Sequence, residues 1–592
     1  MQALGALPKF FHMVWETSPR LMLGNVILRL LGAALPLATL YIGKLIIDEV
    51  IGLSKGEIQE QDWLWTLVAA ELGIALLTVL LNRGISLIDA LLGDRFANES
   101  SIRLIEHAAE LDLPQFEDAQ FYDKLERARR QTVGRVMLIS NVLSQLQDTL
   151  TIIFLAGGLV AFNPWLLLIL VVAVLPTFIN ETYFNQQGYS LARQWTPERR
   201  ELDYLRYIGA SDNTAKEIKI FGLSGFLKNR FAEVAENYYQ ANKKLSIKRA
   251  SWAFFFNTLG DIGYYIAYAF IILQAVSGAI TIGTLTFLAG SFSRMRGLLQ
   301  GILTRFSSIA ERALYLQDFF DFLELQPSIR SEAHAKSAPD QIREGFVFEN
   351  VGFRYPNTDV WAIRNLSFTL HVGEKLALVG ENGAGKTTLV KLLARLYDPD
   401  EGRILLDGVD IREYDLDEFR KLIGVIFQDF VRFQLKVADN IAVGKIENRE
   451  ERPQIEEAAH LSLAEDVIQG LPEQYEQMLG RRFNNGVELS GGQWQKIALG
   501  RAYMRDAQVL TLDEPTAALD ARAEYEVFKR FSGLTEGKTA VLISHRFSTV
   551  RMADRILVLT KGELQEIGSH EELLEQDGLY AELFNLQAEG YR

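Results

Sequence analysis

The 592-residue sequence contains no cysteine, which excludes disulfide bonds, thiolate catalysis and cysteine-bound metals. Basic residues are in deficit, because 61 lysines and arginines stand against 75 aspartates and glutamates, a net charge of −14. This balance argues against a nucleic-acid partner, which would require a basic patch. The first twenty residues lack the charged-then-apolar pattern of a secretory signal. Long apolar runs are scarce after residue 300, so we expect domains of two different kinds.

The apolar runs of the first half are long enough to cross a membrane. Leu21–Gly43 and Trp63–Leu81 each carry a single charge. Two further runs flank Asn163, and two more surround the tight link Ser277–Gly283. We therefore predict six transmembrane helices. A large buried helical core is the alternative, but soluble cores rarely hold several such runs in succession.

The loops between these spans differ in charge, and this difference predicts their side of the membrane. Segments 94–135 and 186–249 are rich in lysine and arginine, whereas the three short links are poor in them. Basic loops stay in the cytosol, so we place both termini there and the short links outside. The long loops have helical periodicity, which predicts helices that leave the membrane, turn near 113–124 and 211–222, and return.

The second half contains a phosphate-binding pattern, Gly380-x-x-x-x-Gly385-Lys386-Thr387. An apolar run that predicts a strand precedes it and a helical pattern follows it, so the helix N-terminus would face the phosphates. Glycines allow backbone N–H groups to turn towards phosphate oxygens. The residues that we expect to surround ATP here are Gly380, Glu381, Asn382, Gly383, Ala384, Gly385, Lys386, Thr387 and Thr388.

Further motifs follow this loop in a fixed order. Their sequences are "FRYPN" with Tyr355, "GVIFQDF" with Gln428, "LSGGQ" with Ser490, Gly491, Gly492 and Gln493, "VLTLDEP" with Asp513 and Glu514, and "VLISH" with His545. The ordered set resembles the ATP-binding cassette of ABC transporters. With six spans upstream, the whole chain resembles an exporter-type half-transporter, as seen among bacterial peptide, lantibiotic, multidrug and lipid exporters.

This resemblance implies the fold and the domain boundaries. We expect an all-α polytopic membrane domain over residues 1–325, a linker over 326–345 and an α/β P-loop ATPase cassette over 346–592. The segments near 113–124 and 211–222 would then be the coupling loops. The chain would be a multi-pass protein of the bacterial plasma membrane with its cassette in the cytosol.

Each motif residue has a physical role that fits this resemblance. Tyr355 offers a face on which adenine can stack, and Asp513 is expected to hold Mg²⁺ with Thr387 and Gln428. Glu514 is the expected general base for the attacking water, and His545 the group that contacts the γ-phosphate and orients Glu514. Gln428 would also sense the γ-phosphate. ATP and Mg²⁺ are therefore the expected cofactors.

The signature "LSGGQ" implies a partner. Its hydroxyl, backbone N–H groups and helix dipole form a second anion site, which in the family closes on the nucleotide of another cassette. A second copy of the chain is the simplest partner, and a heterodimer is the alternative. Two positions depart from the common family pattern, Ala518 where serine is common and Trp494 where arginine is frequent.

The substrate is the least determined property. Segments such as "FEDAQFYDKLERARR" and the stretch before the signature resemble exporters of lantibiotic peptides, so we predict export of an amphipathic substrate, with peptide favoured. A lipid flippase or multidrug exporter is the alternative within this class, and an importer of the same fold is a further one. A soluble ATPase is disfavoured by the six spans. Polar residues inside spans are expensive in lipid and usually face a cavity, and those proposed here are Arg29, Glu71, Asp148, Asp261 and Arg294.

Overall fold

The computed structural model describes residues 5–118, 121, 124–125, 132–162, 164–332, 334–513, 529, 533, 535, 537–544 and 547–589. Its contacts divide the chain into two compact units. The helical unit comprises Met1–Ala109 and Asp123–Leu325, and the cassette unit comprises Glu110–Tyr122 and Gln326–Arg592. Residues 110–122 therefore group with the second unit although they lie in the first half of the sequence.

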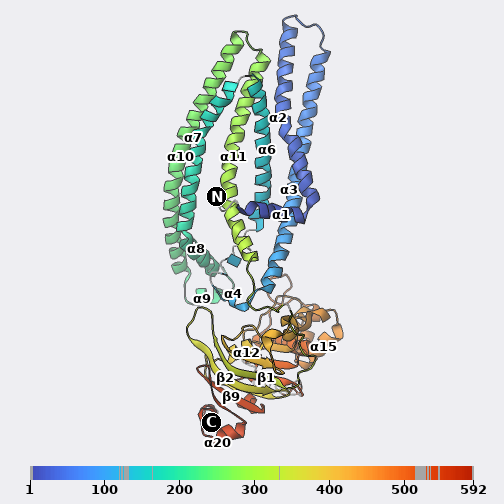
Figure 1. Cartoon of the computed structure of the whole chain (residues 1–592), viewed down its shortest axis with the longest axis vertical. Coiled ribbons are helices and arrows are strands. Elements are labelled where there is room, and N and C mark those ends of the chain that lie inside the picture. The colour runs from blue at the N-terminus through green and yellow to red at the C-terminus, as the bar shows by residue number, and fades with distance from the viewer. Residues whose placement is uncertain are drawn as a thin grey trace. The chain divides into compact units, whose positions relative to one another are not determined.

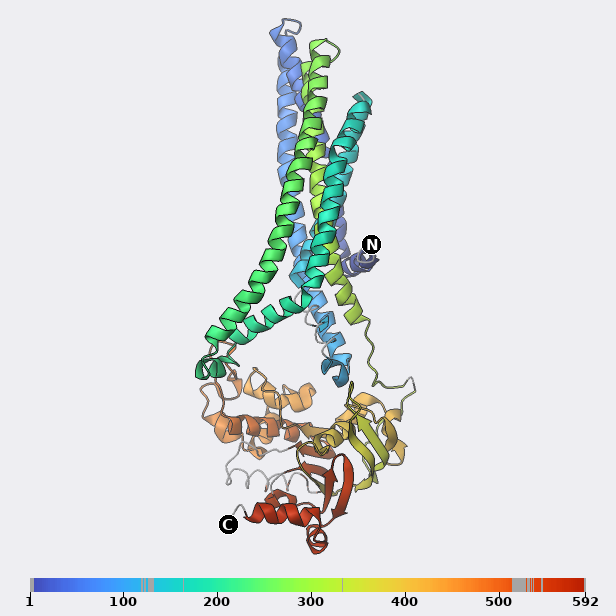
Figure 2. The same cartoon turned by 90° about the vertical axis from the view of Figure 1, so that its left-hand side faces the viewer.

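The long helices of the helical unit run lengthwise beside one another (Figures 1 and 2). The helices of this unit are α1 (Leu7–Thr17), α2 (Pro19–Ser54), α3 (Asp62–Glu110), α6 (Thr132–Phe162), α7 (Pro164–Gln194), α8 (Thr196–Gly209), α9 (Ala215–Ile220), α10 (Ser224–Val276) and α11 (Ile282–Leu323). Helix α6 packs against both α2 and α11, while α10 packs mainly against α7.

Within the described residues, four helices are long and apolar enough to cross a membrane: α2, α3, the stretch Met137–Ala161 of α6, and α10. Large apolar side chains such as Leu76 and Leu80 point outwards from α3 and are well exposed, as expected for a surface that faces lipid. Helices α7 and α11 are the other two long helices of this unit. Helix α7 contains one internal proline, Pro176, and α11 contains none.

The length of two helices requires that they continue beyond the bilayer. Helix α10 has 53 residues and α3 has 49. At a rise of about 1.5 Å per residue they extend over roughly 73–80 Å, whereas the hydrocarbon core is only about 30 Å thick. After α3, a turn at Leu111–Asp112 leads into the short helix α4 (Leu113–Phe116), and α8 and α9 are joined by a turn at 210–214. The predicted turn 113–124 therefore contains the short helix α4, and the predicted turn 211–222 contains the short helix α9.

The cassette unit is built on two sheets. One is antiparallel, in the order β2-β1-β4-β5, and the other has the order β10-β9-β3-β8-β7-β6. In the second sheet β9, β3, β8, β7 and β6 are parallel and β10 is antiparallel to β9. The strands are β1 (Gly345–Arg354), β2 (Trp361–His371), β3 (Lys375–Val379), β4 (Glu401–Leu406), β5 (Val409–Asp410), β6 (Ile423–Ile426), β7 (Val509–Asp513), β8 (Thr539–Ile543), β9 (Arg555–Thr560) and β10 (Glu563–Gly568).

The α-helices that follow β3 complete the cores of this unit. They are α12 (Lys386–Leu393), α13 (Leu416–Lys421), α14 (Val437–Ala442), α15 (Arg452–Leu461), α16 (Glu465–Gln469), α17 (Gly491–Arg505), α19 (Phe547–Val550), α20 (His570–Glu575) and α21 (Leu579–Glu589). The larger core joins both sheets to α12, through side chains such as Phe346, Leu378 and Leu389. A separate core joins α14, α15, α16 and α17 around Trp494. The start of α17 thus lies on a different core from β3 and α12, whereas Leu499 and Ala502 further along α17 pack with Leu510 and Leu512 of β7 in another core.

Candidate nucleotide site

The loop between β3 and α12 requires glycine at three positions. Gly380, Gly383 and Gly385 have φ angles of 151°, 82° and 103°, which L side chains rarely adopt. A Cβ atom at Gly385 would lie 2.6 Å from the carbonyl oxygen of Ala362, and one at Gly380 would lie 2.3 Å from that of Leu559. The loop is therefore tightly folded against neighbouring backbone, as a phosphate cradle made of N–H groups requires.

Lys386 begins α12 and is 7% exposed. Its ammonium group donates hydrogen bonds to the carbonyl oxygens of Gly380 at 2.7 Å and Glu381 at 3.0 Å. The side chain thus reaches back across the loop that it follows. A cation fixed at this position, together with the helix N-terminus, supplies the positive charge that a phosphate-binding loop requires.

Thr387 and Asp513 meet beside this loop. The Thr387 hydroxyl donates a 2.8 Å hydrogen bond to the Asp513 carboxylate. Asp513 is the last residue of strand β7 and is 3% exposed. A hydroxyl and a carboxylate are hard oxygen ligands of the kind that Mg²⁺ prefers. The two residues therefore fit a magnesium ion, which they would hold and which would supply positive charge beside bound phosphates. Gln428 is exposed two residues after β6, the strand beside β7.

Tyr355 lies half-buried at the end of β1. Its hydroxyl makes a 3.1 Å hydrogen bond with Thr388, the residue after the magnesium-site threonine. Its ring packs edge-on against Phe353 and Tyr397, and the Lys391 ammonium lies 5.1 Å from the ring centre. The sequence-predicted adenine platform is thus connected to the same helix, α12, that carries the phosphate loop.

The signature residues begin helix α17. Ser490 is its N-cap, and its Oγ accepts from the Gln493 backbone N–H at 3.3 Å, while the Gln493 side chain accepts from the Ser490 N–H at 2.8 Å. This reciprocal pair fixes the first turn, and Ser490 itself is exposed. Gly491 and Gly492 follow in the first turn of α17, where backbone N–H groups have no partner within the helix.

The departure at Trp494 has a structural explanation. The indole is 1% exposed and lies in the core that α14, α15, α16 and α17 form together. In the same helix, Arg501 donates to the Asn440 carbonyl and side chain at 3.0 Å each and lies over the Phe433 ring. Burial lowers the pKa of the Arg501 guanidinium to about 10, which leaves it charged at neutral pH. These contacts hold α17, and with it the signature, against α14.

Glu514, His545 and Ala518 lie outside the described residues, so their roles stay predictions from the sequence. The strands that precede the two catalytic candidates are described: β7 and β8 are parallel neighbours in register from Val509–Thr539 to Asp513–Ile543. Parallel register places the carboxyl ends of both strands at one sheet edge.

The five polar residues predicted inside the spans occupy different environments. Arg29 is 5% exposed and pairs with Asp89 at 2.6 Å. Asp148 pairs with Arg305 and Asp261 with Arg296, in each case between two helices. Arg294 is exposed and Glu71 is half-buried. Arg29 and Asp148 can therefore reach a substrate only if these ion pairs open.

Sequence reasoning missed the partner residues Asp89 and Arg305. A signal for Asp89 was present, because it is a lone acid in the apolar stretch "SLIDALL", the same kind of feature that singled out Glu71. Asp48 was missed too. Its carboxylate accepts from the Gly283 N–H at 2.9 Å and from the Thr281 hydroxyl at 3.0 Å, and so connects the end of α2 to the start of α11.

Comparison with known proteins identifies relatives over the whole chain. The model of the family described as "ABC transporter" matches residues 363–517. The subtilin transport ATP-binding protein SpaT of Bacillus subtilis is 31% identical over 98% of this chain and 93% of its own length. The nisin transport ATP-binding protein NisT of Lactococcus lactis subsp. lactis is 27% identical over 98% and 95%. An ATP-dependent lipid A-core flippase of Alkalilimnicola ehrlichii is 34% identical over 76% and 75%.

A solved structure is similar in fold over almost the entire chain. The structure of a bacterial Atm1-family ABC exporter with ATP bound superimposes with a TM-score of 0.81 at 25% identity, covering 96% of this chain and 98% of the other. The similarity spans both the helical unit and the cassette unit. It extends the relationship well beyond the residues that the family model matches.

Proposed function

The chain belongs to the ABC transporter family and has the exporter-type half-transporter architecture, and from this premise we propose that it exports an amphipathic peptide across the bacterial plasma membrane. The family hydrolyses ATP to drive transport. The observation that carries the proposal is the full-length similarity to the subtilin and nisin transport proteins, which spans the membrane helices as well as the cassette.

In the proposed cycle, ATP is bound by the phosphate loop of one copy and by the Ser490–Gln493 signature of another. Thr387, Asp513 and Gln428 would hold Mg²⁺, which would neutralise charge on the phosphates. Glu514 would take a proton from the attacking water, and His545 would orient Glu514. Closure of two cassettes on ATP would switch the helices from inward- to outward-open, and hydrolysis would reset them.

The proposed assembly is a homodimer. A single chain has one phosphate loop and one signature, held on different cores. The exposed Ser490 supports a site completed by a second copy, because an anion-binding helix N-terminus is available at the surface. We further propose that the termini and the cassette lie in the cytosol, as the basic loops indicate.

Complementation between two inactive variants tests this assembly. Lys386→Ala removes the phosphate contact and Ser490→Arg blocks the signature, so neither variant alone should hydrolyse ATP. A mixed pair retains one intact site, made from the phosphate loop of the Ser490→Arg chain and the signature of the Lys386→Ala chain. Hydrolysis should return only on co-expression. Purified mixed pairs that stay inactive would count against the shared site.

A lipid flippase is the second candidate, because lipid A-core flippases are 34% identical over about three quarters of the chain. Stimulation of ATP hydrolysis in lipid nanodiscs discriminates the two. The probes are nisin, an unmodified peptide of equal charge, and lipid A. Saturable stimulation by nisin supports the peptide reading, whereas stimulation by lipid A alone would replace it with the flippase.

A further inference from the structure

Three lysines lie on α10 shortly before its apolar part. They are Lys243, Lys244 and Lys248, and all three are exposed. The ammonium group of Lys243 lies 5.8 Å from the centre of the Tyr239 ring. The sequence from Asn237 to Gly260 contains no aspartate or glutamate, although the chain as a whole has a net charge of −14. This part of α10 is therefore a local concentration of positive charge on an acidic protein.

Two of these lysines share one line of the helix with an exposed tryptophan. Lys244 and Lys248, called the lysine pair below, and Trp252 are spaced four residues apart, which places them one above another on a helix of 3.6 residues per turn. Trp252 is 51% exposed. The same face continues with exposed apolar side chains, namely Phe255, Leu259, Ile262, Ile266 and Leu273. The face thus changes from charged to apolar between Lys248 and Trp252.

This change marks the place where α10 enters the membrane. Helix α10 is one of the described helices that are long and apolar enough to span a bilayer. A different side of it packs inside the protein, where Ala267 and Ile271 join a core with Phe287 and Leu288 of α11. The exposed apolar face is therefore the side that is suited to lipid. A tryptophan at the start of such a face, with lysines just before it, is typical of a helix at a membrane surface.

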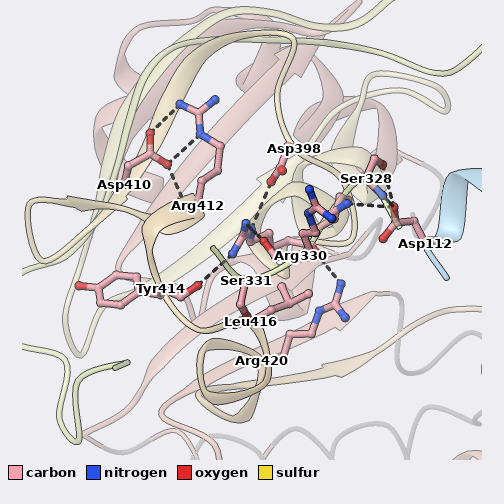
Figure 3. A network of polar contacts seen from close by, with 12 residues as sticks. Asp112, Ser328, Arg330, Ser331, Asp398, Asp410, Arg412, Tyr414, Leu416 and Arg420 are labelled. Carbon is pink, nitrogen blue, oxygen red and sulfur yellow. Dashed lines mark hydrogen bonds and ion pairs between the residues drawn. The ribbon is translucent and has the colours of Figure 1, made fainter. Parts of the chain in front are cut away.

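The lysine pair differs from other cations of the chain in having no counter-ion. The adjacent Arg249 donates a 2.6 Å hydrogen bond to Glu181 of α7, and Arg412 of the cassette unit pairs with Asp410 at 2.6 Å (Figure 3). Among the described residues, by contrast, no carboxylate forms an ion pair with either member of the lysine pair. Two positive charges at the membrane surface are thus open to an anion from the surroundings.

Distance and screening favour an anion that belongs to the membrane. At a rise of about 1.5 Å per residue, Lys248 and Lys244 lie about 6 Å and 12 Å before Trp252 along the helix. The Debye length at physiological salt is about 8 Å, and lysine side chains extend towards the interface with their charged ends in water. One lysine near an anionic membrane surface raises the affinity about fivefold. Both lysines are therefore close enough to attract a charged lipid headgroup.

We propose that the lysine pair and Trp252 bind the headgroup of an anionic phospholipid, whose acyl chains lie along the exposed apolar face of α10. In the proposed topology this lipid belongs to the cytosolic leaflet. The site is separate from the predicted substrate residue Asp261. That residue lies nine positions after Trp252, two and a half turns, and so on the opposite side of α10, where it pairs with Arg296. The inference goes beyond the proposed export and does not depend on the transported cargo.

The absence of cysteine allows a probe to be placed beside the lysine pair. Ile247→Cys, at a position that is 56% exposed, introduces the only thiol, which is labelled with bimane. The labelled full chain is reconstituted in phosphatidylcholine nanodiscs that contain nitroxide-labelled phosphatidylglycerol or, at the same fraction, nitroxide-labelled phosphatidylcholine. The ratio of bimane quenching by these two lipids measures the local preference for the anionic lipid. We expect a ratio of at least about five at low salt, and a smaller ratio at high salt.

The charge of the lysine pair is then removed or retained. Lys244→Gln with Lys248→Gln should bring the quenching ratio close to one, whereas Lys244→Arg with Lys248→Arg should keep it, since the charge remains. The matched control is Lys228→Gln with Lys421→Gln, which removes the same charge from exposed positions. Lys228 lies about 30 Å from Lys248 along α10, and Lys421 belongs to the cassette unit, so this variant should keep the ratio.

Three outcomes would overturn the lipid site. Equal quenching by both lipids in the chain that carries only Ile247→Cys would mean that the site has no preference for an anion. An unchanged ratio in the double glutamine variant would assign the preference to other residues. Quenching by neither lipid would mean that protein, such as a second copy of the chain, covers this face. ATP hydrolysis in the same nanodiscs tests the proposed function separately, because the quenching ratio does not depend on turnover.

Discussion

The Thr387 hydroxyl donates a 2.8 Å hydrogen bond to the Asp513 carboxylate, which joins the first turn of α12 to the end of β7. This contact brings together two residues that are 126 positions apart in the sequence. It is also the place where Mg²⁺ is proposed to bind, because both groups are oxygen ligands beside the phosphate loop.

The first prediction follows from this pair. Asp513→Asn removes the negative ligand, so magnesium-dependent hydrolysis should fall by about 100-fold or more, roughly 2.7 kcal/mol of barrier. ATP binding without magnesium should change much less, because Lys386 and the loop N–H groups remain. Steady-state hydrolysis and binding of a fluorescent ATP analogue, with and without magnesium, measure the two effects.

Asp359→Asn, an exposed acid of the same unit, serves as the control and should hydrolyse ATP normally. Equal loss of nucleotide binding with and without magnesium in Asp513→Asn would show that Asp513 supports the loop and not the metal.

The second prediction concerns Tyr355. Removal of its ring in Tyr355→Ala should weaken ATP binding by about 5- to 150-fold, because stacking on a base contributes roughly 1–3 kcal/mol. Tyr355→Phe keeps the ring but loses the hydrogen bond to Thr388, and should bind ATP almost as well as the unsubstituted chain. Equilibrium binding of ATP and of UTP separates base recognition from phosphate recognition.

The contrary outcome is specific. If Tyr355→Ala lowered the affinity for ATP and UTP by the same factor, Tyr355 would act through Thr388 and the phosphate loop, and the stacking role would be wrong.

The third prediction tests the membrane topology, using the absence of cysteine. Ser54→Cys, at the end of α2, should react with an impermeant maleimide from outside intact cells. Ser211→Cys, in the turn between α8 and α9, should react only after permeabilisation. The physical reason is the concentration of basic residues in the long loops, which are retained in the cytosol. Labelling of Ser211→Cys in intact cells would reverse the orientation.

The sequence predicted the parts of the site that depend on local spacing. The strand, loop and helix around Lys386 are confirmed in the structure, and the glycines of the loop have the positive φ angles that such a turn requires. The N-cap at Ser490 follows from the same kind of local rule. By contrast, the contacts of Asp112 with Ser328 and of Arg395 with Arg330 connect segments far apart in the chain. No spacing rule indicates such pairs, since each residue alone resembles a solvated polar residue.

The membrane residues show the same limit. Polar residues within apolar spans were identified from the sequence, but their pairing was not, because it depends on how the helices pack. Arg29 shows this most clearly. It donates to Asn25 and Asp89 at 2.6 Å each, and the Ser140 hydroxyl donates to the same aspartate at 2.8 Å. The cluster joins α2, α3 and α6, and a substrate role for Arg29 would have to compete with these bonds.

The last prediction therefore weighs helix packing against substrate contact at Arg29. Arg29→Met and Asp89→Leu should each lower the stability of the purified protein by about 3 kcal/mol, because removal of one partner leaves the other charge buried and unpaired. The double variant should be more stable than the sum of the single changes predicts, since no charge is then left without its partner. Thermal unfolding followed by tryptophan fluorescence in detergent measures this cycle, with Arg294→Met, at an exposed position, as the control. If Arg29→Met left the unfolding temperature unchanged but raised the nisin concentration that half-stimulates ATP hydrolysis, Arg29 would be a substrate contact, as its place in the span first suggested.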